Sequence, residues 1–135
     1  MKKIITTGLI TGVVLLVLGF GMVYLTVLAF PGLAEQYYNP VFRTGDDRSW
    51  LFFVHPFILG LGLAWFWERF KGQFNGWFLL RGLELGLVYV AVAVLPSMWI
   101  KFSAFDVSLT MILTWLLYGF VQAAVAGILL ARLNP

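Results

Sequence analysis

The chain opens with an apolar run that is longer than one membrane crossing requires. Residues Ile4 to Phe30 include no charged side chain, and the run is 27 residues long. A helix needs roughly 20 apolar residues to cross the hydrocarbon core of a bilayer. Lys2 and Lys3 before the run resemble the start of a signal peptide, but the apolar region of a signal peptide has only about 7–15 residues. We therefore expect a retained transmembrane helix over residues 4–30.

Three further apolar segments predict three more transmembrane helices. These segments cover residues 50–70, 77–99 and 106–131. Ser103 and Asp106 resemble a capping box at the start of the last helix. A polar stretch over residues 31–49 predicts an external loop between the first two helices. The predicted fold class is an all-α membrane protein, in which four transmembrane helices form an up-down-up-down bundle as one domain over residues 1–135.

The composition supports lipid as the surrounding solvent and narrows the possible chemistry. Apolar residues make up 61% of the chain and charged residues only 11%, whereas a soluble domain carries about 25% charged residues. The net charge of +3 is small and dispersed, so we expect the lipid bilayer as a partner and no nucleic acid. The chain has no cysteine and one histidine. We therefore expect no disulfide, no thiol chemistry, no metal site and no cofactor.

The distribution of Lys and Arg predicts the orientation of the helices. One side of the membrane would hold six of these residues, namely Lys2, Lys3, Arg69, Lys71, Arg81 and Arg132. The opposite side would hold three, namely Arg43, Arg48 and Lys101. Basic residues are enriched in cytoplasmic loops. We therefore expect a multi-pass protein of the inner (plasma) membrane with both termini in the cytoplasm.

Small residues recur at four-residue spacing in the predicted helices. Gly82 and Gly86 do so in the third helix, and Gly119, Ala123 and Gly127 do so in the fourth. Within lipid, such residues let helix backbones approach closely, where dispersion forces hold them together. These stripes predict helix packing inside one bundle. The alternative is that one stripe, that of the last helix, faces a second protomer.

Glu84 is the acidic residue that the sequence places deepest in a predicted helix. It lies about 10 Å along that helix at 1.5 Å per residue. An ionisable group at such a depth is costly and suggests a function. One interpretation is that Glu84 pairs with Arg81, one turn earlier, and reaches the interface. The other is that it joins Gln122, Tyr118 and Thr11 in a buried polar cluster, which would either hold helices together or form a proton or substrate site.

A second group of candidates lies toward the outer side. His55 is roughly 8 Å inside the second predicted helix, Thr110 is at a similar depth, and Asp106 is closer to the surface. A histidine with a nearby carboxylate can respond to pH. The alternative is an interfacial histidine that bonds to the loop backbone.

Two short stretches carry a resemblance to known proteins. Residues Tyr37–Asn39 lie in the first loop, and Phe105–Leu109 precede the last helix. With these stretches and four spans, the chain resembles uncharacterised small four-span prokaryotic integral membrane proteins. The resemblance implies the fold and the membrane location, and it implies no activity.

No constellation of catalytic residues emerges from the sequence. The serines show no nucleophile-elbow pattern, and we do not expect an enzyme. The small-residue stripes favour a non-enzymatic membrane protein that acts by helix–helix association, either as a homo-oligomer or as an accessory subunit of a partner membrane protein. The alternative hypothesis is a small proton-coupled transporter or ligand-binding membrane protein that uses Glu84.

Overall fold

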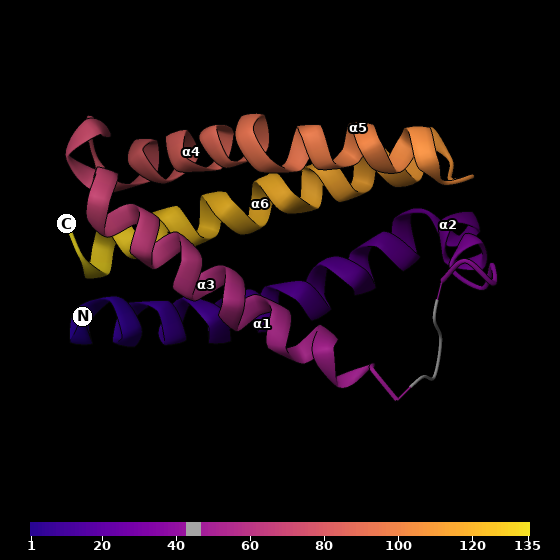
Figure 1. The fold of residues 1–135 in the computed structure, drawn as a ribbon, viewed down its shortest axis with the longest axis horizontal. Coiled ribbons are helices and arrows are strands. Elements are labelled where there is room, and N and C mark those ends of the chain that lie inside the picture. Colours follow the sequence, from indigo (N-terminus) through magenta and orange to yellow (C-terminus); the bar gives the residue numbers. More distant parts are fainter. Residues whose placement is uncertain (43–46) are drawn as a thin grey trace.

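The computed structural model describes residues 1–42 and 47–135, and all of its regular structure is helical (Figure 1). Within these residues, four helical segments are long and apolar enough to cross a membrane, as the sequence predicted. They are α1 (Lys2–Ala29), α3 (Trp50–Phe70), the continuous segment α4 (Phe78–Tyr89), η2 (Val90–Val94) and α5 (Leu95–Ala104), and α6 (Leu109–Leu133). Two short elements, α2 (Pro31–Gln36) and η1 (Lys71–Gln73), follow α1 and α3. Arg43, which the charge count placed on the outer side, lies outside the described residues.

Helix α6 lies at the centre of the packing. Helix α1 packs against α3, α4 packs against α6, and α6 also contacts α1, α3, α5 and η2. Both termini lie at the same end of the molecule as η1, and α2 lies at the opposite end (Figure 1). Toward the α2 end, α3 diverges from the α4–α5 segment (Figure 1). This divergence determines where the molecule is hollow.

Glycines bring the paired helices into backbone contact. A Cβ added to Gly60 would lie 2.6 Å from the carbonyl oxygen of Gly8, and one added to Gly127 would lie 2.8 Å from that of Gly82. No real Cβ tolerates such distances, so only glycine allows these crossings. Gly119 and Ala123 are also buried within the chain. The small-residue stripe of α6 thus packs against other helices of the same chain.

The last helix begins later than its sequence suggested. Helix α6 starts at Leu109, and the Ser108 hydroxyl caps it by accepting a hydrogen bond from the Met111 amide at 3.2 Å. Ser103 is still in α5, where its hydroxyl donates to the Ile100 carbonyl at 2.8 Å. The predicted capping box of Ser103 and Asp106 is therefore wrong, because the preceding helix extends through Ser103.

A π-helical turn, η2, separates α4 from α5. Pro96 follows this turn as the second residue of α5. A proline inside a helix lacks an amide hydrogen, and its ring collides with the carbonyl four residues earlier. That carbonyl belongs to Val92, which lies in the π turn. The widened turn accommodates the proline, so the helix continues to Ala104 instead of ending near residue 99.

The outer surface of the bundle is mostly apolar. Val17, Val92 and Trp99 are 68%, 74% and 76% exposed, and many other large apolar side chains share this exposure. A chain in water hides such groups, whereas hydrocarbon solvates them. The surface thus agrees with the four span-length helices.

Candidate ligand-binding site

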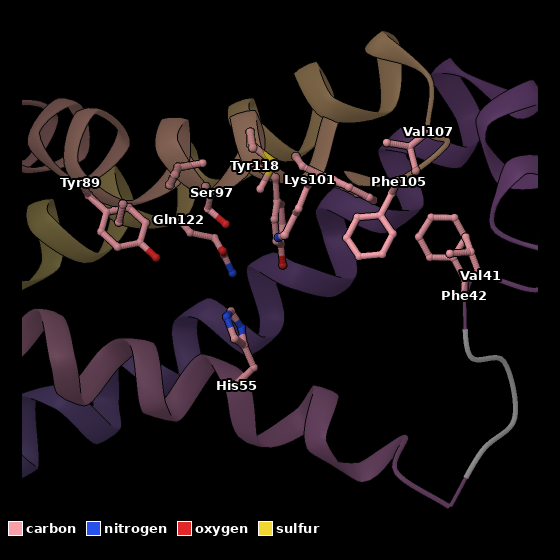
Figure 2. Close-up of a pocket in the computed structure, with 15 residues that line it drawn as sticks. Val41, Phe42, His55, Tyr89, Ser97, Lys101, Phe105, Val107, Tyr118 and Gln122 are labelled. Carbon is pink, nitrogen blue, oxygen red and sulfur yellow. The ribbon is translucent and has the colours of Figure 1, made fainter. Parts of the chain in front are cut away.

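A cavity of about 570 Å³ lies where α3 diverges from the α4–α5 segment. Its walls come from α3, from the end of α4 through α5, and from α6 (Figure 2). Residues just after α2 and just after α5 line its outer end. Seven of its described lining side chains carry hydrogen-bonding groups, namely His55, Tyr89, Ser97, Lys101, Trp115, Tyr118 and Gln122. The size lies within the range of about 300–1,000 Å³ that is typical of small-molecule sites.

Gln122 is the polar side chain that is buried most deeply in this cavity. It is only 3% exposed, and its Nε2 has no hydrogen-bond partner among the described residues. Its side chain interacts with the Tyr118 hydroxyl four residues earlier on the same face. The amide nitrogen points across the space toward His55 of α3 (Figure 2). A buried donor without a partner costs about 1–3 kcal/mol, so this amide is suited to meet an acceptor on a bound molecule.

The π turn aligns polar residues along the wall of the cavity that α4, η2 and α5 form. Tyr89, Ala93, Ser97 and Lys101 line the cavity at four-residue intervals. In a regular α-helix, residues four apart drift by about 40° around the axis, because each turn holds 3.6 residues. A π turn holds more residues and offsets part of that drift. Such turns occur frequently at functional sites, and this one brings four successive positions to a single face.

An aromatic cluster lies at the end of the cavity toward α2. The Trp115 indole Nε1 donates a hydrogen bond to the Tyr37 hydroxyl at 2.6 Å. The Phe42 ring meets that of Trp115 edge-on, with the ring centroids 6.2 Å apart. The Lys101 ammonium lies 5.7 Å from the centre of the Trp115 ring. These contacts fix the first loop against α6 and hold a cation at the rim of the cavity.

The structure brings together residues that the sequence placed in separate groups. Tyr118 and Gln122 were predicted on the inner side and His55 on the outer side, and all three line one cavity. Thr11 is fully buried in α1, and its hydroxyl has no hydrogen-bond partner in the described part of the chain. It does not line the cavity. Thr11 is therefore part of the helix packing.

Glu84 does not join Gln122 and Tyr118. It is exposed, whereas its neighbours Gly82 and Gly86 are buried against α6, so the carboxylate lies on the other face of α4. The described residues offer it no hydrogen bond or ion pair. The expected pair with Arg81 does not form, because the Arg81 guanidinium donates to the Lys71 carbonyl at 3.1 Å. That guanidinium also lies 4.9 Å from the centre of the Trp67 ring.

The structure also separates the three residues that the sequence grouped toward the outer side. Thr110 and Asp106 are exposed and do not line the cavity, whereas His55 points into it (Figure 2). Sequence reasoning missed Lys101 and Ser97 as site residues. Their four-residue spacing places both on one face of α5, but the sequence does not show the π turn, which extends this face back to Ala93 and Tyr89.

No protein family, curated protein or solved structure matches this chain. Among the described residues, no three His, Cys, Asp or Glu side chains are grouped so as to hold a metal ion. The arrangement offers hydrogen-bond donors, one cationic lysine and apolar walls, and these groups are suited to reversible binding.

Proposed function

We propose that this chain is an integral membrane protein that binds an amphipathic small molecule in the cavity between α3 and α5 and does not transform it. The unpaired amide of Gln122 inside the cavity is the observation that supports this best. A buried donor at the wall of a hollow is explained by a molecule that accepts its hydrogen bond. The surrounding apolar side chains supply the hydrophobic part of the binding energy.

The proposed topology has four spans in up-down-up-down order, with both termini in the cytoplasm of a prokaryotic inner membrane. The excess of Lys and Arg at the end that holds both termini supports this orientation. In this orientation, Lys101 and the aromatic cluster face the outer leaflet. His55 and Ser97 are exposed on the sides of the cavity, which allows the ligand to enter laterally from the bilayer.

A cavity-filling substitution tests the proposal. Ala93 is exposed and lines the cavity, whereas Ala91 is exposed and does not. The protein would be extracted in a mild detergent, and mass spectrometry would identify the small molecules that it retains. We expect a stoichiometric ligand on the wild type and on Ala91→Trp, and at least about a tenfold loss on Ala93→Trp, since the indole would occupy the ligand's volume. Equal retention by the two variants, at equal thermal stability, would contradict the proposal.

The exposed Glu84 supports a second proposal, namely that the protein associates with another copy of itself. An ionised carboxylate on an apolar, exposed helix face is costly in a bilayer, and a facing protomer would shield it. A proton-coupled transporter that uses Glu84 would need this carboxylate in a cavity or at such an interface. Because Glu84 does not line the cavity, only the interface with a second copy would serve that role.

Particle mass in several detergents tests the association. We expect a dimer that Glu84→Leu weakens. A monomer throughout, or a dimer that this change does not affect, would rule out this interface.

A further inference from the structure

Among the residues that the structure describes, the lining of the cavity carries positive charge and no acidic side chain. Its described lining includes Lys101 and His55, but neither an aspartate nor a glutamate. The described residues give Lys101 no ion pair, and its nearest aromatic neighbour is Trp115. The hydroxyl and amide groups of Ser97 and Gln122 add further donors. Such a lining selects a ligand whose polar part is anionic and rich in hydrogen-bond acceptors.

A second hollow of about 460 Å³ lies beside the first, between α3 and the α4–η2 segment. Tyr89 and Ala93 line both hollows, so the two are adjacent. Apart from Tyr89 and Trp65, the described residues that line the second hollow have aliphatic or phenylalanine side chains or are glycine. Its lining runs from Ile58 to Phe66 of α3, which is about 12 Å along the helix. A chamber that contains a lysine and several hydrogen-bonding groups thus lies beside an apolar groove.

We propose that the ligand is an anionic lipid. Its phosphate or carboxylate head lies near Lys101 and His55, and its acyl chain runs past Ala93 into the apolar groove. This assignment rests on the proposed function, and it adds the chemical class of the ligand. The order of the two hollows matches a lipid of the outer leaflet, because Lys101 lies near the membrane surface in the proposed topology and the groove extends toward the membrane interior.

Two lipids with identical chains separate the role of charge from that of the chain. Native mass spectrometry would measure binding of dioleoyl phosphatidylglycerol and dioleoyl phosphatidylcholine to the purified full-length protein. We expect one tightly bound lipid, with roughly a tenfold preference for the anionic one. Lys101→Gln should remove this preference, and Lys101→Arg should keep it. Lys2→Gln serves as the matched control, because Lys2 is the first residue of α1 and the N-terminus lies at the end of the molecule opposite α2 (Figure 1).

The same titrations distinguish failure of this inference from failure of the proposed function. Equal binding of the two lipids, or a preference that Lys101→Gln leaves intact, would overturn the anionic assignment. Displacement of the lipid by inorganic phosphate alone would overturn the role of the acyl chain. Ala93→Trp should abolish binding of both lipids. If Ala93→Trp binds both lipids like the wild type, the proposed function fails as well. If Ala93→Trp loses both lipids but the wild type shows no preference for the anionic one, only the lipid class is overturned.

Discussion

Trp67 shows how a single side chain fixes the end of the bundle that holds both termini. It is fully buried, and its indole Nε1 donates a hydrogen bond to the Asn134 carbonyl at 2.8 Å. Phe74 stacks on its ring with the centroids 5.4 Å apart, and the Arg81 guanidinium covers the ring as well. The indole therefore joins α3, the link after it, α4 and the end of α6. Tryptophans near the ends of membrane helices commonly lie exposed in an interfacial belt, whereas Trp67 is 0% exposed.

At this scale we predict that Trp67→Phe destabilises the protein more than Trp65→Phe. The first substitution leaves a buried carbonyl without its donor, which costs about 1–3 kcal/mol. Trp65 is 49% exposed, and a surface change of this kind usually costs less than about 0.5 kcal/mol. Thermal unfolding in detergent, followed by circular dichroism, would compare the two variants. Equal midpoints would show that the buried hydrogen bond does not contribute to stability.

At the scale of elements, hydropathy predicts the number of long helices but not their local geometry. Each apolar run is long enough to require a helix, because every backbone polar group in lipid must be paired internally. The π turn η2 could not be predicted in this way. A proline inside a helix usually breaks it, but the π turn before Pro96 accommodates its ring, and the chain continues as a helix to Ala104. The wall of the cavity depends on that continuation.

The helix crossings lead to a prediction about two glycines. Gly127→Ala should lower the unfolding midpoint, because the new methyl group would meet the Gly82 backbone at 2.8 Å and force α4 and α6 apart. Overpacking of this kind typically costs about 1–3 kcal/mol. A methyl group at Gly21 meets no atom within 4 Å. Gly21→Ala should therefore leave stability unchanged or raise it, since alanine is the better helix former. A reversed order of the two midpoints would show that this crossing is not as close as described.

At the scale of the whole molecule, the sequence could indicate lipid as the solvent but not the location of the site. Glu84 was a candidate site residue because it is charged, but it lies on an exposed face of α4. Gln122 and His55 come from helices whose relative placement depends on how α3 diverges from α5. Residue spacing along one helix does not contain that information. The site is a property of tertiary packing.

The proposed topology gives a prediction at the same scale. The chain has no cysteine, so single cysteines introduced at Asp47 and Asn75 can be labelled without interference. In intact cells we expect an impermeant maleimide to reach Asp47→Cys but not Asn75→Cys, because the positive-inside rule places residue 75 in the cytoplasm. Permeabilised cells should show labelling of both variants. Labelling of both from outside would contradict the alternating order of the helices.

Site-specific photo-crosslinking in intact membranes tests most directly whether the cavity is a binding site. A benzophenone amino acid would replace Ser97, which lines the cavity, or Ala91, which does not, and mass spectrometry would identify the adducts. We predict that position 97 captures one amphipathic species far in excess of its share of the membrane lipids, and that Ala93→Trp suppresses this adduct. Position 91 should capture lipids in proportion to their abundance. Identical adduct patterns at the two positions would contradict the account.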